Sequence, residues 1–360
     1  MGDPRDEHAK RNLGETFRRL IAATGPISLA HFMAESNARY YATREAIGGE
    51  GADFTTAPEI SQMFGELIGL WLADMWSRAG SPDLVHYVEL GPGRGTLARD
   101  ALRAMKQHGL APRVHLVETS PRMRDAQLQA VPDVVHHDDL GSIPADAPIL
   151  LVANEFLDAL PVRQIVRTSQ GWREVMVGVD AEGAFAETPG RHAMDSAVPE
   201  ERRSDPKGTV IETSPACAAV VSEVATRLAE QGGAALFIDY GYRHGRSGST
   251  LQAVRNHQKV GVFDAPGEAD LSAHVDFAQM ALVARSQECK VFGTLTQGEF
   301  LTALGIDPRA DALAASAPQH RDMLMKAKAR LTASDQMGEL FKVMGLAAPT
   351  WPDGAGFPAG

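Results

Sequence analysis

The sequence LVHYVELGPGRGT, residues 84–96, joins a short apolar run to a glycine-rich turn and then to the start of an amphipathic helix. Glycines at such a turn let the backbone approach a ligand closely. The helix that follows offers free N–H groups and a partial positive charge at its N-terminus. This stretch therefore predicts a strand, a ligand-binding turn and a helix, which together open a βαβ unit.

The same alternation continues downstream of Thr96. Further short apolar runs are VHLVE (114–118), DVVHH (133–137) and ILLVANE (149–155). Helices are expected between them, from Thr96 to His108 and from Ser120, with Pro121 at the first position of the second helix. Short strands that alternate with helices predict a Rossmann-like α/β fold, a mostly parallel twisted sheet with helices on both faces.

The flanking regions divide the chain into three expected parts. Residues 1–80 form an N-terminal helical region with a loop that covers the ligand site, residues 81–299 form the α/β core, and residues 300–360 form a C-terminal helical segment on the core. A hairpin of residues 162–168 and 172–179 and a polar surface segment, 187–207, make an insertion at about 163–208. The run AALFIDYGY (234–242) then returns the chain to the sheet.

Composition narrows the class of protein. The net charge of −11 at pH 7 argues against nucleic acid or an anionic membrane as the main partner, because both need a concentrated basic surface. The two cysteines, Cys217 and Cys289, match no disulfide or metal-ligand spacing. No signal peptide, transit peptide or bilayer-spanning stretch is evident. We expect a cytoplasmic bacterial protein, or one of the mitochondrial matrix only if a transit peptide has been removed.

The glycine-rich turn places an acid and three glycines at alternate positions: Glu89, Gly91, Gly93 and Gly95. A dinucleotide fingerprint would have its third glycine at Thr96, so the pattern favours S-adenosylmethionine over NAD as the cofactor. Glu118 ends the next strand, where an open α/β sheet places the carboxylate that binds ribose hydroxyls. The alternative is a tight turn that binds no ligand.

Two acids end the third strand. Asp138 and Asp139 are expected to reach the adenine amino group at the carboxyl edge of the sheet, and the alternative is a solvated strand end. The histidines before them, His136 and His137, are neighbours on a strand and point to opposite faces, so they predict no metal site.

Polar residues also end the fourth strand. Asn154 and Glu155 interrupt an apolar run, and an unpaired buried carboxylate is costly unless it has a role. Asn154 is expected to contact the cofactor, with capping of a helix as the alternative. Glu155, Asp158 and Asp239, the last at the end of the strand 234–242, form the expected catalytic site for the substrate.

Six separated motifs match one known family. They are DFTTAPEIS (53–61), FGELIG (64–69), ELGPGRGTL (89–97), NEFLDALPV (154–162), FIDYG (237–241) and DLSAHVDF (270–277). By these motifs the chain resembles, over nearly its whole length, the MidA-like family of S-adenosylmethionine-dependent methyltransferases. The resemblance implies a class I methyltransferase fold in which Gly91, Gly93 and Gly95 hold the cofactor. The segment Thr56–Glu59, which includes Pro58, would close over it.

The resemblance also implies a substrate. Mitochondrial members of the family act in the assembly of respiratory complex I, so the implied reaction is methylation of an arginine in the subunit that carries the quinone-site region. A guanidinium is protonated at neutral pH, and we expect Glu155, Asp158 and Asp239 to hold it and polarise one nitrogen. The alternatives are an assembly chaperone with a non-catalytic methyltransferase fold and an NAD-dependent oxidoreductase. A homodimer is left open.

Overall fold

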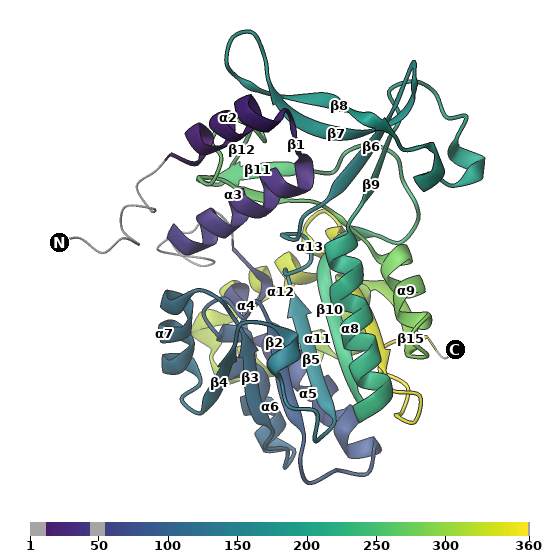
Figure 1. Cartoon of the computed structure of the whole chain (residues 1–360). Coiled ribbons are helices and arrows are strands. Elements are labelled where there is room, and N and C mark those ends of the chain that lie inside the picture. Colours follow the sequence, from purple (N-terminus) through teal and green to yellow (C-terminus); the bar gives the residue numbers. More distant parts are fainter. Residues whose placement is uncertain (1–11, 44–54, 359–360) are drawn as a thin grey trace, which may run out of the picture. The chain divides into compact units, whose positions relative to one another are not determined.

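The computed structural model describes residues 12–43 and 55–358 (Figure 1). The chain divides into two compact units, each made of separate stretches of sequence. Unit 1 comprises the described residues of Met1–Glu45, Ala159–Ala216 and Arg246–Ala273, and unit 2 those of Ala46–Asp158, Cys217–Gly245 and His274–Gly360. The units interleave along the chain, which differs from the three consecutive parts expected from the sequence.

Unit 2 is the α/β unit. Its strands are β2 (His86–Leu90), β3 (Arg113–Val117), β4 (Val134–His137), β5 (Ile149–Asn154), β10 (Gly233–Tyr242), β14 (Val275–Asp276), β15 (Lys290–Thr296) and β16 (Phe341–Ala347). Its helices are α4 (Ala57–Ile60), α5 (Gln62–Arg78), α6 (Thr96–Gln107), α7 (Pro121–Ala130), η1 (Leu140–Ser142), most of α8 (Pro215–Gln231), α9 (Phe277–Arg285), α10 (Gln297–Ala303), α11 (Ile306–Ser316), η4 (Pro318–His320), α12 (Arg321–Thr332) and α13 (Met337–Leu340). The strands and helices expected from residues 84–155 are confirmed.

The strands of unit 2 form one eight-stranded sheet in the order β15-β16-β10-β5-β2-β3-β4, with β14 paired to the end of β10. Pairing is parallel from β10 through β5, β2 and β3 to β4, whereas β16 is antiparallel to β10 and to β15. The mostly parallel sheet is therefore confirmed. Because the parallel strands share a direction, the carboxyl ends of β2, β3, β4, β5 and β10 lie at one edge of it.

The C-terminal part of unit 2 differs from the helical segment expected for residues 300–360. Phe341–Ala347 forms β16, which is buried at every position and lies between β10 and β15. The tail after β16 buries Trp351 and packs Phe357 on Phe300. A strand buried on both faces shows no alternation of apolar and polar residues, so its sequence pattern does not distinguish it from a buried helix.

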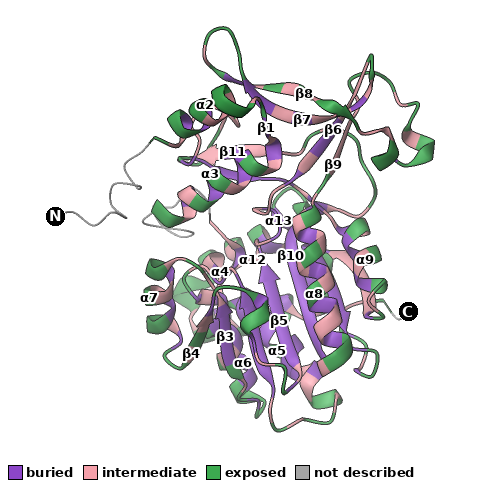
Figure 2. Ribbon diagram, viewed as in Figure 1, coloured by how far each residue is buried: buried purple, intermediate pink, exposed green. Residues whose placement is uncertain are grey.

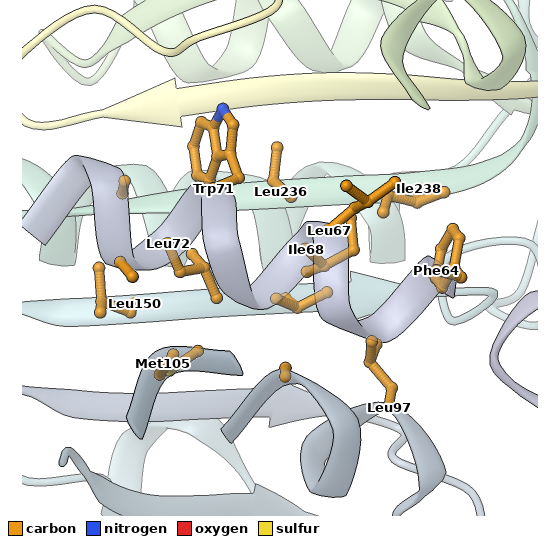
Figure 3. Packing of buried hydrophobic residues seen from close by; sticks show 14 of the residues in the cluster. Phe64, Leu67, Ile68, Trp71, Leu72, Leu97, Met105, Leu150, Leu236 and Ile238 are labelled. Atoms are coloured by element: carbon orange, nitrogen blue, oxygen red, sulfur yellow. The ribbon is translucent and has the colours of Figure 1, made fainter. Parts of the chain in front are cut away.

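Helix α5 packs against the sheet of unit 2, where its apolar side chains meet Leu150 and Leu236 (Figure 3). On its other side it packs closely on α6. A Cβ at Gly69 would lie 2.3 Å from the carbonyl oxygen of Ala101, and a Cβ at Gly65 would also be too close to α6. The glycines of the FGELIG motif therefore let the two helix backbones touch, which gives this motif a structural role.

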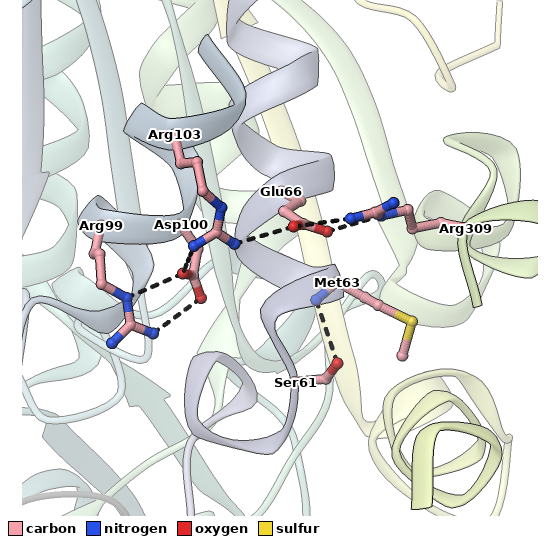
Figure 4. Close-up of polar contacts among 7 residues, drawn as sticks. All are labelled: Ser61, Met63, Glu66, Arg99, Asp100, Arg103 and Arg309. Atoms are coloured by element: carbon pink, nitrogen blue, oxygen red, sulfur yellow. Dashed lines mark hydrogen bonds and ion pairs between the residues drawn. The ribbon is translucent and has the colours of Figure 1, made fainter. Parts of the chain in front are cut away.

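An ion-pair network joins α5, α6 and α11 (Figure 4). Asp100, which is only 1% exposed, accepts hydrogen bonds from Arg99 and Arg103 at 3.0 Å each. Glu66 accepts from Arg103 at 3.0 Å and from Arg309 at 2.8 Å. A buried carboxylate needs such partners. The network therefore helps to hold α6, which begins at the glycine-rich turn, against α5.

Three buried histidines form a hydrogen-bonded chain across the sheet of unit 2. His86 Nδ1 lies 2.9 Å from His115 Nε2, and His115 Nδ1 lies 2.9 Å from His137 Nε2. At its ends, His86 Nε2 lies 2.8 Å from Asp146 Oδ1, and His137 Nδ1 lies 2.9 Å from Ser142 Oγ. Each of these four hydrogen bonds needs one hydrogen, whereas three neutral imidazoles carry only three N–H hydrogens in total. Either the Ser142 hydroxyl supplies the fourth or the chain holds an extra proton.

The described residues of unit 1 form two sheets, two α-helices and two short 3-10 helices. Its helices are α2 (Leu13–Thr24), α3 (Leu29–Thr43), η2 (Asp195–Ala197) and η3 (Glu200–Arg202), and its strands are β1 (Ile27–Ser28), β6 (Arg163–Thr168), β7 (Gly171–Val179), β8 (Phe185–Ala193), β9 (Val210–Thr213), β11 (Gln252–Arg255), β12 (Gln258–Val260) and β13 (Asp270–Ser272). The expected hairpin is confirmed, because β6 pairs antiparallel with β7. The polar segment expected at 187–207 begins instead with part of β8, which pairs with β7.

The buried apolar residues form a separate core in each unit. In unit 2 the sheet is buried along most of its strands, whereas the outer faces of its helices are exposed (Figure 2). In unit 1 the core gathers around Phe17, Phe32 and Phe185, whose rings contact one another. Within the part of the chain that the structure describes, every helix is too short or too polar to cross a bilayer.

Candidate active site

The glycine-rich turn between β2 and α6 has left-handed backbone at three positions. The φ angles of Gly91, Gly93 and Gly95 are 61°, 52° and 78°, a region that favours glycine. A Cβ at Gly91 would lie 2.8 Å from Phe156 Cδ2, so packing also requires a glycine there. A Cβ at Gly93 would meet no described atom within 4 Å. The backbone at Gly93 is therefore open, as close approach of a ligand requires.

Glu89 lies at the base of this turn and is only 3% exposed. Its Oε2 accepts a hydrogen bond of 2.6 Å from the hydroxyl of Tyr87. Burial raises the pKa of Glu89 to about 8, and the bond from Tyr87 opposes that rise. Glu89 therefore has a partner inside the core of unit 2, and its predicted contact with the cofactor stays a prediction.

Glu118 follows β3 and is half-buried. Its Oε1 accepts a hydrogen bond of 2.7 Å from the backbone N–H of Ser120, and its Oε2 lies 3.4 Å from Nε2 of Gln127. Burial raises the pKa of the Glu118 carboxyl, and these hydrogen bonds lower it. The carboxylate is thus held in one orientation at the edge where β2 also ends.

The two acids after β4 both have partners in the fold. Asp138 is well exposed and forms an ion pair of 2.6 Å with Arg124. This arrangement fits the alternative interpretation of Asp138, a solvated strand end. Asp139 is the N-cap of η1, where its Oδ1 accepts from the backbone N–H of Ser142 at 3.0 Å. Capping was not predicted for Asp139, and adenine contacts by either acid stay predictions.

Asn154 ends β5 beside Gly91, because Ala153 pairs with Leu90 in the sheet. It is only 8% exposed, and its Oδ1 has no hydrogen-bond partner among the described residues. The capping alternative for Asn154 is wrong, because a turn rather than a helix follows it. An unpartnered buried acceptor is costly, so it calls for a donor from a ligand.

Glu155 follows directly and has a φ of 52°, an uncommon conformation for a residue with a side chain. Its Oε1 accepts hydrogen bonds from the backbone N–H of Ala57 at 2.9 Å and from Asn154 Nδ2 at 3.2 Å. Strained backbone of this kind is concentrated at functional sites. Glu155 thus links the end of β5 to the segment Thr56–Glu59.

That segment forms the short helix α4, with Thr56 at its N-cap position and Pro58 buried. The Oε1 of Glu59 accepts a hydrogen bond of 2.6 Å from Thr96 Oγ1, at the start of α6. Helix α4 is therefore tied both to the glycine-rich turn and to Glu155. The first two residues of the motif DFTTAPEIS and the loop before it lie outside the described residues.

Asp239 has a different arrangement from the expected one. It is 1% exposed, and its Oδ2 accepts hydrogen bonds from the backbone N–H groups of Phe156, Leu157 and Asp158 at 3.1, 2.8 and 3.1 Å. Its Oδ1 accepts from the backbone N–H of Tyr240 at 2.8 Å. Asp239 was predicted to hold the substrate. Because both of its carboxylate oxygens accept hydrogen bonds from backbone N–H groups, these contacts favour a positioning role for it.

Acidic side chains are concentrated at the carboxyl ends of β5 and β10. Burial, first of all, and then the nearby charge of Glu155 raise the pKa of Asp239 to about 8, against the lowering effect of its backbone hydrogen bonds. Asp158 is also buried at this edge. In the described part of the chain, no group of three or more His, Cys, Asp or Glu side chains could hold a metal ion.

These residues fit a ligand that carries both an amine and a carboxylate. The unpartnered Oδ1 of Asn154 can accept from an ammonium, and the open backbone at Gly93 with the first turn of α6 can bind a carboxylate. The methionine moiety of S-adenosylmethionine has both groups. The residues present therefore suit that cofactor.

The sequence did not predict the side-chain contacts that connect these parts. Thr96 and Glu59 join α4 to the turn, and Gln127 and Arg124 of α7 contact the ends of β3 and β4. Arg124 and Gln127 are three residues apart, so they share one face of α7. That spacing was the available signal for the second pair.

Comparisons with known proteins identify the family and the fold of the chain. Residues 67–295, more than half of the chain, match the family model described as "Putative S-adenosyl-L-methionine-dependent methyltransferase". A crystal structure from Burkholderia thailandensis, bound to S-adenosyl-homocysteine, is similar with a TM-score of 0.82 and 28% identity, over 99% of this chain and 96% of that chain. The expected class I methyltransferase fold is confirmed by this likeness.

Curated relatives are similar over most of their length. The "Protein arginine methyltransferase NDUFAF7, mitochondrial" of Danio rerio is 35% identical, over 89% of this chain and 83% of its own. The protein of the same name from Homo sapiens is 33% identical, over 91% of this chain and 81% of its own. The chain therefore belongs to this family of S-adenosyl-L-methionine-dependent methyltransferases.

Proposed function

We propose that this protein transfers the methyl group of S-adenosylmethionine to an arginine of a protein. The observation that carries the proposal is the group of carboxylates at the ends of β5 and β10, where the charge of Glu155 helps to raise the pKa of Asp239. A cation bound beside these acids would favour their ionised form, and a guanidinium is a planar cation suited to carboxylates. The names of the curated relatives support the same substrate class.

Within this proposal the cofactor lies along the sheet edge. Gly91, Gly93 and Gly95 face its methionine carboxylate, Asn154 accepts from its ammonium and Glu118 binds its ribose. Asp138 and Asp139 lie toward its adenine, and Thr56 and Pro58 of α4 cover it. Glu89 stabilises the turn through its hydrogen bond with the Tyr87 hydroxyl.

The bound cofactor supplies a methyl group already activated by its sulfonium. The chain then needs to align the acceptor nitrogen with that methyl and to exclude water. Glu155 and Asp158 hold the guanidinium, and the proton that the attacking nitrogen loses passes to a Glu155 carboxylate oxygen. Asp239 acts through the backbone of residues 156–158, which it fixes.

The proposed client is a subunit of respiratory complex I, as the resemblance to the MidA-like family implies. The curated relatives are named as mitochondrial. We propose that this chain acts in the bacterial cytoplasm, or in the matrix if a transit peptide has been removed, and a homodimer stays a prediction. The family does not support the oxidoreductase alternative.

The test is transfer of label from S-adenosylmethionine with a labelled methyl group. The purified protein is incubated with complex I subunits of its host, and mass spectrometry locates the label. Label on an arginine is the expected result. Label on another residue type would overturn the arginine assignment, and client binding without any label would favour the chaperone alternative.

A further inference from the structure

Gln127 of α7 lies between two parts of the proposed cofactor site. It is fully buried, and its Nε2 donates a hydrogen bond of 2.7 Å to the carbonyl oxygen of Gly93. The same Nε2 lies 3.4 Å from Oε2 of Glu118. One side-chain amide therefore spans the glycine-rich turn and the carboxylate proposed to bind ribose.

The orientation of this amide is determined by its partners. The Gly93 carbonyl accepts only, and so does the ionised Glu118 carboxylate, so the amide nitrogen must face them. Gln127 Oε1 then needs a donor, which is Nε2 of His136 at 2.9 Å. A reversed amide would place its oxygen against the Gly93 carbonyl and the Glu118 carboxylate, which cannot donate. The orientation of Gln127 therefore selects the His136 tautomer that carries its hydrogen on Nε2.

Arg124, one turn earlier on α7, fixes the neighbouring strand ends. Its Nε donates to the carbonyl oxygen of Glu118 at 2.7 Å, and its Nη2 donates to the carbonyl oxygen of His137 at 3.1 Å. The same Nη2 pairs with Asp138 at 2.6 Å. With Gln127, it ties the exits of β3 and β4 and the turn after β2 to a single helix.

We infer that Gln127 is a positioning residue for the cofactor, which sets the separation of the Gly93 backbone from the Glu118 carboxylate before the cofactor binds. The inference rests on the proposed cofactor roles of Gly93 and Glu118. Preorganised groups bind more tightly because binding does not have to order them. The effect should therefore appear in the affinity for the cofactor and in its KM, with little change in kcat.

The test compares three variants by calorimetric titration with S-adenosyl-homocysteine. Gln127→Leu keeps the approximate volume and removes both donors, and we expect its affinity to fall about tenfold. Gln127→Glu places a carboxylate against Gly93 and Glu118, so its affinity should fall further and recover in part as the pH is lowered. Gln129→Glu is the control, because Gln129 is exposed on the same helix and should bind as the wild type does.

The outcomes separate this inference from the proposed function. A wild-type protein that does not bind S-adenosyl-homocysteine would remove the proposed cofactor site itself. A wild type that binds, with both Gln127 variants binding equally well, would overturn the positioning role. Thermal unfolding without ligand checks that the variants fold. If they do not, His136→Phe decides the question, because it removes only the donor to Gln127 and should weaken binding about threefold.

Discussion

Thr96 Oγ1 donates a hydrogen bond of 2.6 Å to Glu59 Oε1, and this contact joins the covering helix α4 to the first residue of the helix that follows the glycine-rich turn. Two family motifs that are separate in the sequence, TAPE and ELGPGRGTL, therefore meet through their side chains. A hydrogen bond to a charged acceptor contributes about 1.5–3 kcal/mol.

Thr96→Val keeps the shape of the side chain and removes this donor. We expect the KM for S-adenosylmethionine to rise about tenfold, because α4 loses one of the two hydrogen bonds that tie it to the proposed site among the described residues. Steady-state kinetics with varied cofactor measure the effect. Thr96→Ser retains the hydroxyl and should stay close to wild type, and a similar loss in both variants would contradict the role of the hydrogen bond.

Gly93→Ala should abolish binding of the cofactor while the protein still folds. The φ of 52° costs an alanine about 1–2 kcal/mol, and the new Cβ enters the open space where we place the methionine carboxylate. Gly109→Ala is a matched control, because Gly109 has a φ of 81° and also meets no described atom within 4 Å at its Cβ. It lies after the far end of α6. Both variants should lose similar stability, and calorimetry should show binding by Gly109→Ala alone.

Glu155→Gln should lower turnover at least about 100-fold with little change in the affinity for S-adenosyl-homocysteine. The glutamine retains an oxygen that can accept from the backbone N–H of Ala57, so α4 keeps its attachment. The variant loses the negative charge of Glu155, which holds the guanidinium and accepts its proton. Single-turnover assays at saturating cofactor measure the effect, and unchanged turnover would remove Glu155 from the mechanism.

Asp239→Asn should act differently, through stability. The aspartate accepts four backbone N–H groups with its two oxygens, whereas an asparagine would turn an NH2 group toward some of these donors. We expect unfolding free energy to fall by about 1–3 kcal/mol. Denaturant unfolding measures it. Normal stability with lost turnover would restore Asp239 to the catalytic group that the sequence predicted.

The contrast between Glu155 and Asp239 shows how far the sequence could predict the site. Both acids end buried strands, and strand order in a parallel sheet brings such ends to one edge. The sequence pattern could therefore place them together, as it placed Gly93 and Glu118. It could not show which carboxylate meets backbone N–H groups, because that depends on the turn at residues 156–158.

The fold shows the same limit. The βαβ pattern of residues 84–155 is local, and its strands and helices were predicted correctly. Strand β16 is determined instead by its position between β10 and β15, with both faces covered, and nothing within Phe341–Ala347 shows this. Likewise, Gln127 is one polar residue on an amphipathic helix until the structure places the Gly93 carbonyl beside it.

The histidine chain of unit 2 predicts how stability depends on pH. Burial, mainly, with the charges of His86 and His137, lowers the pKa of His115 to about 4 from an ordinary 6.5. The unfolded chain therefore takes up a proton near pH 6.5, whereas the folded protein resists protonation until about pH 4. Stability is fully present above pH 6.5 and falls as the pH drops toward 4, by about 1–3 kcal/mol for this group.

The measurement is the free energy of unfolding between pH 4 and pH 8 for the wild type and for His115→Leu. The variant should be less stable at pH 7.5, because His86 and His137 each lose a hydrogen-bond partner, yet its stability should change less between pH 6.5 and pH 4. His108→Gln, at an exposed helix end, should keep the wild-type slope. Equal slopes in all three proteins would mean that the row of three histidines takes up a proton at no cost in stability. The number of hydrogens permits this only if the Ser142 hydroxyl donates to the carbonyl of Asp139 and not to His137.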